Sequence, residues 1–206
     1  MEFIGTFFFI FAIAMTGNPF AIAAMLMAWV YIGGAVSGAH YNPAVTLAVA
    51  LRGHLAWSNV PKYMVAQILG GLSAFALSYF FTGSVQYTQP GQGVTFLQAF
   101  IMEVLLAFVL ALVVLVVATW DKFRPNYVFG FAIGFTILAL AFVGSPVSGG
   151  LFNPAISLGS ALLALILHAP HLSWELVGMY VGGALLGGAL AAYAFKYLIL
   201  DEDLLA

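Results

Sequence analysis

The chain has 206 residues, of which 64% are hydrophobic and 6% charged, and its net charge is −2. A soluble globular protein carries about 25% charged residues, so the five Lys and Arg and seven Asp and Glu here are too few to coat a surface that faces water. The charge balance excludes a basic nucleic-acid-binding surface. The absence of cysteine excludes disulfides, thiol catalysis and thiolate metal sites.

Apolar segments of the chain predict an all-α membrane protein with six spanning helices, because a helix needs roughly 20 apolar residues to cross ~30 Å of hydrocarbon. The first segment has the length of a signal-peptide core. It follows Met1-Glu2, however, without a positively charged region or a clear cleavage site, so we interpret it as a short first span. The predicted spans, in chain order, are 2–16, 20–37, 59–81, 95–119, 126–144 and 173–198.

Two further apolar stretches, 43–51 and 154–167, do not fit as ordinary spans. Each follows a glycine-containing, irregular segment that ends in Asn-Pro. Irregular backbone at membrane depth is tolerated only where protein or a water-filled cavity satisfies its polar groups. These stretches are therefore predicted to be re-entrant half-helices that line a pore.

The positive charges predict the orientation of the spans. Cytoplasmic loops of membrane proteins carry an excess of Lys and Arg. With a cytoplasmic N-terminus and C-terminus, all five cationic residues fall on the cytoplasmic side, and the opposite loops contain none. We therefore expect a multi-pass protein of the plasma or inner membrane with both termini in the cytoplasm; the five residues are Arg52, Lys62, Lys122, Arg124 and Lys196.

An internal repeat divides the chain into two predicted halves, 1–94 and 95–206, within one channel domain. The segment 37–47, SGAHYNPAVTL, recurs 111 residues later at 148–158 as SGGLFNPAISL. Weaker echoes pair Glu2 with Glu103, and Gly70-Gly71 with Gly182-Gly183. Three spans per half place the second half upside down, which is a known architecture of channels and transporters.

Each Asn-Pro-Ala triplet has the features of a helix start. Asn is a good N-cap, and Pro is favoured in the first turn of a helix. Two such helices that meet from opposite faces would point their partly positive ends at each other and repel cations. The asparagine amides would donate hydrogen bonds to a passing water and orient it. The predicted pore motifs are Asn42, Pro43, Ala44, Asn153, Pro154 and Ala155.

The sequence resembles the aquaporin (major intrinsic protein) family over essentially its whole length. The resemblance rests on Glu2-Phe3-Ile4-Gly5-Thr6, the segment 37–46, Ala66-Gln67 with Gly70-Gly71, Glu103, and Asn153-Pro154-Ala155. It implies six spans, two half-helices, one pore per subunit and a homotetramer. It also implies a passive channel for water and small uncharged solutes, with no cofactor and no enzymatic activity.

The chain departs from the family at the outer constriction, the selectivity filter. Family members usually carry Arg three positions after the second Asn, where this chain has Ile156. Counting from the motifs places Ile22, Ala141 and Gly150 at the other filter positions, with Phe20 as the nearest aromatic that could enter. This set has no aromatic, no His and no charge, so we expect a wide, apolar filter that passes glycerol, urea or similar solutes.

Three polar residues accompany the motifs. Glu2 and Glu103 are predicted to accept hydrogen bonds from the half-helix loops, with a proton relay as the alternative. His40 is predicted to line the pore or support its loop, and pH gating is the alternative. No metal-ligand cluster accompanies it.

The competing functions are a water-selective aquaporin and a coupled solute transporter. A transporter needs an ion site, and the spans offer little beyond the two glutamates. An enzyme would need an acid–base pair or a nucleophile with a partner, which the motifs do not supply.

Overall fold

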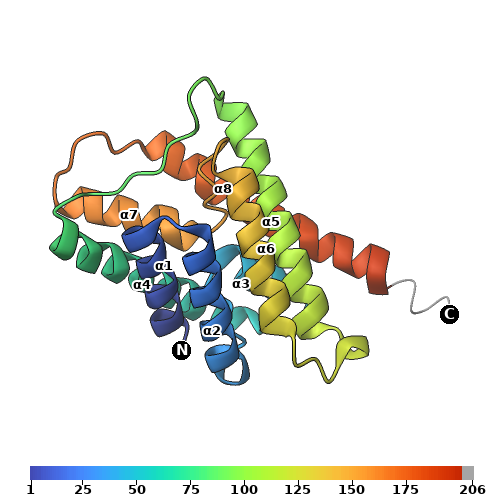
Figure 1. The fold of residues 1–206 in the computed structure, drawn as a ribbon. Helices are drawn as coiled ribbons and strands as arrows, with labels where there is room; N and C mark the ends of the chain where they lie inside the picture. Colours follow the sequence, from blue (N-terminus) through green and yellow to red (C-terminus); the bar gives the residue numbers. More distant parts are fainter. Residues whose placement is uncertain (201–206) are drawn as a thin grey trace.

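The computed structural model describes residues 1–200, and within them every regular element is helical (Figure 1). The predicted all-α fold is therefore confirmed for this range. Residues 201–206, which include the C-terminus predicted to be cytoplasmic, lie outside the described part. The α-helices are α1 (Glu2–Thr16), α2 (Pro19–Ser37), α3 (Pro43–Leu51), α4 (Val60–Thr82), α5 (Phe96–Thr119), α6 (Phe129–Gly144), α7 (Pro154–Ile166) and α8 (Trp174–Ala194).

Helix boundaries follow local chemistry in the sequence. The side chain of Asn18 caps α2, whose first residue is Pro19, and Thr95 forms a capping box at the start of α5. Gly17 and Gly38 end α1 and α2 in the left-handed conformation that glycine adopts without strain. The sixth predicted span differs most from the structure, because α8 ends at Ala194 and continues as a π-helical turn, Phe195–Leu200.

Within residues 1–200, four helical segments are long and apolar enough to cross a membrane by themselves: Pro19–Ser37, Trp57–Thr82, Phe96–Thr119 and Trp174–Leu198. Helices α1 and α6 were also expected to span, and they have 15 and 16 residues. At 1.5 Å per residue they rise about 22–24 Å, which is less than the ~30 Å hydrocarbon core. Such a mismatch is accommodated by local thinning of the bilayer or by flanking residues.

Glycines allow each half-helix to pack closely on a long helix from the other end of the chain. A Cβ on Gly71 in α4 would stand 2.4 Å from the carbonyl oxygen of Ala155 in α7. A Cβ on Gly188 in α8 would stand 2.4 Å from the carbonyl oxygen of Ala44 in α3. Helices in membranes use small residues in this way to bring backbones together.

The glycine contacts correct the predicted echo between α4 and α8. Gly70 faces the backbone of α1 and Gly187 faces the backbone of α5, so Gly70-Gly71 correspond in space to Gly187-Gly188. A Cβ on Gly182, the expected partner of Gly70, would meet only the ring of Phe100 within 4 Å, at 3.9 Å. The sequence comparison matched the wrong glycine pair because α8 contains several, and only the helix contacts distinguish them.

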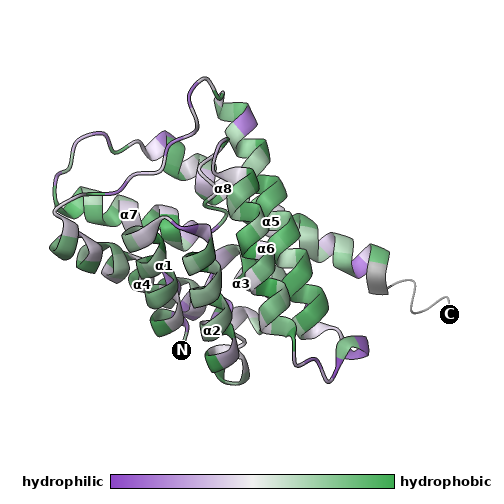
Figure 2. Cartoon of the chain, viewed as in Figure 1, coloured by the Kyte–Doolittle hydropathy of each residue, from purple (hydrophilic) through white to green (hydrophobic). Residues whose placement is uncertain are grey.

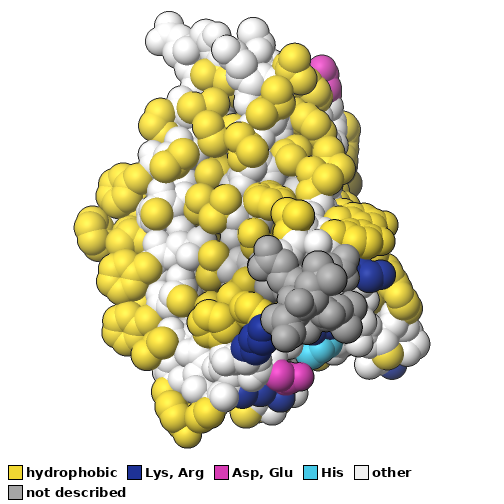
Figure 3. All heavy atoms as spheres, turned by 90° about the vertical axis from the view of Figure 1, so that its right-hand side faces the viewer, with side chains coloured by type: hydrophobic (Ala, Val, Ile, Leu, Met, Phe, Trp, Pro, Cys, Tyr) yellow, Lys and Arg dark blue, Asp and Glu magenta, His cyan; other side chains and the backbone are white. Residues whose placement is uncertain are grey.

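The surface of the helices agrees with a lipid environment. Figure 2 shows apolar residues along most of each helix, with hydrophilic residues gathered in the loops. On the face seen in Figure 3, hydrophobic side chains cover much of the surface, and the Lys and Arg side chains visible there lie in its lower half.

Candidate functional site

The two Asn-Pro-Ala triplets meet inside the protein and hold each other in place. Asn42 and Asn153 are N-caps: their Oδ1 atoms accept hydrogen bonds from the N–H of Ala44 at 2.8 Å and of Ala155 at 3.0 Å. The Nδ2 of Asn42 donates to the carbonyl of Phe152 at 3.0 Å, and the Nδ2 of Asn153 donates to the carbonyl of Tyr41 at 3.0 Å. A side-chain amide has two N–H donors, so each Asn retains one N–H for another acceptor.

Buried carboxylates hold the loops that present these residues. Glu2, in α1, accepts hydrogen bonds from Ser37 Oγ at 2.6 Å and from the backbone N–H of His40 and Tyr41 at 3.1 and 2.7 Å. The loop it holds includes Ala39 and Tyr41 at positive φ, where a residue with a side chain is strained. The hydrogen bonds to Glu2 stabilise this backbone.

The second carboxylate holds the equivalent loop before α7. Glu103, in α5, accepts from Ser148 Oγ at 2.6 Å, from the N–H of Leu151 at 3.0 Å and from the N–H of Phe152. Its side chain is fully buried. Both predicted support residues therefore contact the loop backbone directly.

The two loop supports differ in one residue. In the first half, Gln67 Nε2 donates to Glu2 Oε2 at 2.7 Å and to Thr46 Oγ1 at 2.8 Å. Gln67 precedes Gly71 by four residues, and Ala184 precedes Gly188 by four, so the second half has a methyl group where the first has an amide. Glu103 consequently has fewer donors than Glu2.

A pair of matching tyrosines that also supports the two loops was not predicted from the sequence. Tyr63 donates to the carbonyl of Ser37 at 2.9 Å, and Tyr180 donates to the carbonyl of Ser148 at 2.6 Å. The two precede Gly71 and Gly188, respectively, by the same number of residues. The correct glycine alignment would have revealed them.

A series of cavities runs past both triplets. The central cavity is small, about 20 Å³, and Asn42 and Asn153 both line it. It shares Phe9, Ile137, Leu151 and Phe152 with an outer cavity of about 150 Å³. In the other direction it shares His40 and Val114 with one inner cavity, and Val30 and Ile133 with another.

The outer cavity contains all four residues that were counted as filter positions: Ile22, Ala141, Gly150 and Ile156. Ile22 comes from α2, Ala141 from α6, and Ile156 from the first turn of α7. Phe20 does not line the cavity. Its ring packs on Phe142 at a centroid distance of 5.8 Å, and the side chain is 64% exposed.

Sequence reasoning missed other residues of the outer cavity. Phe9 of α1 and Phe152 bring aromatic side chains to it, and Thr88 comes from the link between α4 and α5. Nothing in the motif spacing pointed to these residues. Their places depend on how α1 and the link lie against the half-helix loops.

His40 lies at the inner end of the central cavity. Its ring Nδ1 is 3.2 Å from Thr46 Oγ1, and its ring packs on that of Tyr63 with the two ring centroids 5.1 Å apart. It lines both the central and an inner cavity, and its backbone N–H bonds Glu2. Among the described residues, no cluster of three potential metal ligands occurs.

Comparisons with known proteins agree with this architecture. The sequence model of one family, described as Major intrinsic protein, matches residues 1–195. The chain is 34% identical to "Aquaporin NIP1-4" of Oryza sativa subsp. japonica, over 98% of this chain and 77% of that protein. It is 33% identical to "Nodulin-26" of Glycine max, over 95% of this chain and 75% of that protein. The solved structure of the aquaglyceroporin from Plasmodium falciparum aligns with this chain with a TM-score of 0.87 and 21% sequence identity. The alignment covers 100% of this chain and 97% of that one, so the two share the fold of helices with re-entrant loops.

Proposed function

This chain belongs to the major intrinsic protein family, and we propose on that premise that it is a passive channel for water and small uncharged solutes such as glycerol or urea. It is a multi-pass membrane protein and not an enzyme. The proposed filter is formed by Ile22, Ala141, Gly150 and Ile156.

The outer cavity carries the proposal. In its roughly 150 Å³ the four filter residues meet without a charged side chain among the described residues that line it. One water occupies about 30 Å³ in the liquid, so the cavity has room for about five waters. Because an apolar wall offers water few hydrogen bonds, a solute with some carbon surface loses less there than water does.

The asparagine pair is proposed to exclude cations. The N-termini of α3 and α7 each carry about half a positive charge, and they face the central cavity through Asn42 and Asn153. The N–H that each amide retains would donate to the oxygen of a passing water. That water would be oriented with its own hydrogens away from the pair, which interrupts proton hopping.

A water-selective channel is the second candidate, and the central cavity favours it. Its volume of about 20 Å³ is enough for about one water. If this point does not widen, it excludes glycerol regardless of the outer filter.

The assembly and topology are proposed on the same premise. Residues 1–94 and 95–206 would be two inverted halves of one domain, and the channel would form a homotetramer in the plasma or inner membrane. The loop-support contacts of Glu2 and Glu103 are matched in the two halves, which supports this division. The placement of all five Lys and Arg residues on one side of the predicted spans supports cytoplasmic termini.

Stopped-flow measurements on proteoliposomes test the proposal. Purified protein should raise water permeability and also glycerol or urea permeability above that of empty liposomes. Flux should rise linearly with the solute gradient and need no ion gradient. Saturating or ion-dependent flux would indicate a coupled transporter, and flux of water alone would indicate the water-selective candidate.

A further inference from the structure

Arg52 is a cation whose buried Nε has no acceptor in the described part of the protein. It is the C-cap residue of α3, and its side chain is only partly exposed. Its Nε is buried and has no hydrogen-bond partner within residues 1–200. Because a buried N–H without an acceptor is costly, and more so in a charged group, the guanidinium gains from a bound anion.

Aromatic rings hold this guanidinium and join it to a second cation. Arg52 Cζ lies 4.9 Å from the centroid of the Phe195 ring, and the Phe195 side chain is fully buried. The ring centroids of Phe195 and Trp120 are 6.3 Å apart in an edge-to-face arrangement. Lys122 Nζ lies 5.4 Å from the centroid of the Trp120 ring. These contacts join the end of α3 to the end of α8 and to the segment after α5, so Arg52 and Lys122 adjoin one pair of rings.

Two more residues extend the positive charge. The pKa of His54 is lowered from its usual value, first by partial burial and then by the charges of Arg52 and Arg124. The charge of Asp121 acts in the opposite direction. Asp121 Oδ1 lies 3.4 Å from Arg124 Nε, but both side chains are mostly exposed, and such pairs contribute little. We call this group of residues the inner cationic cluster: Arg52, Lys122, Arg124 and His54.

The cluster lies beside a surface that suits the membrane interface. In the π-helical turn, Lys196 Nζ lies 5.4 Å from the centroid of the Tyr197 ring, which stacks on that of Tyr193. Tyr193, Tyr197 and Leu198 are exposed. Tyrosines gather at the level of lipid headgroups, and lysine side chains extend toward them. Figure 3 shows Lys and Arg side chains grouped near a His side chain in the lower half of that face. Because Lys196 directly follows Phe195, the cluster meets this surface at the end of α8.

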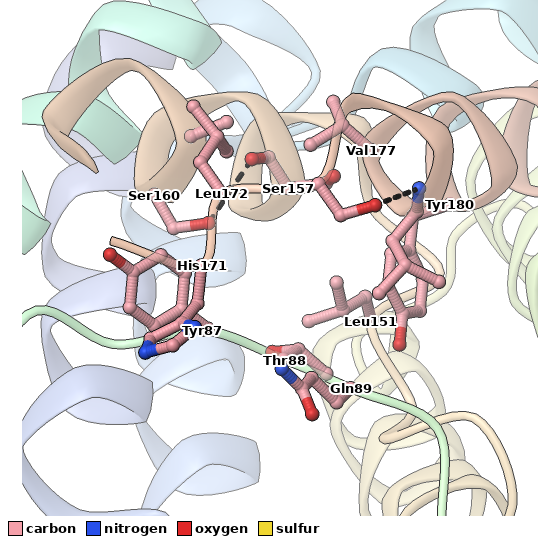
Figure 4. A pocket seen from close by; sticks show the side chains of 13 residues that line it. Tyr87, Thr88, Gln89, Leu151, Ser157, Ser160, His171, Leu172, Val177 and Tyr180 are labelled. Atoms are coloured by element: carbon pink, nitrogen blue, oxygen red, sulfur yellow. Dashed lines mark hydrogen bonds between the residues drawn. The ribbon is translucent and has the colours of Figure 1, made fainter. Parts of the chain in front are cut away.

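The predicted outer side offers no comparable charge. In Figure 4 Thr88 lies opposite Ser157 and Ser160 across a pocket between the α4–α5 link and α7. Among the described residues that line this pocket there is no Lys or Arg, and the predicted outer loops contain none either. Anionic groups are therefore attracted to the inner side.

We propose that the inner cationic cluster binds the phosphate group of an anionic phospholipid, with Arg52 as its main donor. A guanidinium bonds a phosphate through two parallel N–H groups. Lys122 and Arg124 add charge, and basic pockets between helices on the cytoplasmic side of a membrane bind such headgroups. His54 and Arg124 each line an inner cavity, so the bound lipid stands at the inner mouth and ties α3 to α8. The binding does not depend on the proposed channel function.

Phosphatidylglycerol and phosphatidylcholine are the probes, because the first has a net negative headgroup and the second does not. Native mass spectrometry of the full chain in a neutral detergent measures the affinity for each lipid. Wild type should bind phosphatidylglycerol more tightly. Arg52→Gln should weaken that binding at least about tenfold, because hydrogen bonds to charged groups are the strong ones. The same substitution should leave phosphatidylcholine binding unchanged.

Two further variants complete the experiment. Lys62→Gln is the matched control: Lys62 is an exposed cation on the same predicted side, and its Nζ donates to Asn59 Oδ1 at 3.4 Å. Its loss should change phosphatidylglycerol binding less than about twofold, because exposed charges are screened. Arg52→Lys keeps the charge but loses the planar fork, so binding should fall about two- to twelvefold, the effect of one lost hydrogen bond. This variant decides the question if Arg52→Gln does not fold.

Three results would overturn the inference. Equal affinity of wild type for both lipids is one, and equal losses in Arg52→Gln and Lys62→Gln, which indicate general surface charge, are another. Unchanged binding in Arg52→Lys would also overturn it as far as the guanidinium is the main donor. The sequence holds a competing anion in Asp201, Glu202 and Asp203. Lipid binding that appears only after these three are replaced by their amides would assign the cluster to the acidic end of the chain and overturn the inference as well.

Discussion

Ile156→Arg tests the reading of the outer cavity most directly. Ile156 lies in the first turn of α7, is 4% exposed and lines the cavity of about 150 Å³ with Ile22, Ala141 and Gly150. Arginine would extend a longer side chain with a planar group and a permanent charge into this space. The substitution therefore narrows the lumen and charges it together.

The expected magnitudes follow from both effects. Extra atoms forced into a filled space cost about 1–3 kcal/mol. If this cost is added to the barrier for a solute that fills the cavity, the flux of that solute falls roughly five- to 150-fold. Water is smaller and should lose about threefold or less, since room for several waters remains. At about 8 Å and an effective dielectric constant of about 20, the charge raises the energy of a passing cation by ~2 kcal/mol, so any proton or cation leak should fall about thirtyfold.

The assay compares water, glycerol and urea flux with proton leak in proteoliposomes of wild type, Ile156→Arg and Ile156→Gln. Gln is long and uncharged, so it should reduce glycerol flux without the thirtyfold effect on leak. Equal losses for all solutes in Ile156→Arg would place the narrowest point elsewhere, at the asparagine pair. A wild-type channel that passes only water would refute the wide-filter reasoning altogether.

Three further predictions concern the asparagine pair, the loop support and the orientation. Asn153→Asp keeps the capping oxygen but puts a negative charge at the central cavity, so cation conductance, measured by electrophysiology or liposome flux, should rise at least about tenfold. Unchanged conductance would mean that this residue does not face the lumen. Glu103→Gln replaces the carboxylate that accepts three hydrogen bonds by a neutral amide. Because hydrogen bonds to charged groups contribute about 1.5–3 kcal/mol, the thermal stability of this variant in detergent should fall clearly, whereas that of the exposed control Glu175→Gln should change little. Normal stability with an altered proton dependence of flux would favour a proton relay. Cysteines introduced at Gln92 and at Lys122 should be labelled by an impermeant reagent from opposite sides of the membrane, and labelling from the same side would contradict the six-span topology.

The sequence by itself determined the class of fold and most helix boundaries. Composition, span length and the preference of Asn-Pro for a helix start depend on the residues of each segment and not on which other segments it contacts. For this reason 43–51 was predicted with the bounds that α3 has, and α7 ends one residue short of the predicted 154–167. The four proposed filter positions were counted from the motifs, and the structure brings these residues to one cavity.

Only the tertiary structure decided which elements meet. The sequence paired Gly70-Gly71 with the wrong glycines, because a local pattern cannot show which backbone a glycine approaches. It gave no sign of Phe9 or Thr88 at the outer cavity, since Phe9 lies on α1 and Thr88 on a link without regular structure. Their positions depend on contacts between segments far apart in the chain, such as that of Gln86 with Ala14. The solute that passes depends on the chemistry of the residues so assembled, and therefore on packing that periodicity and motif spacing do not encode.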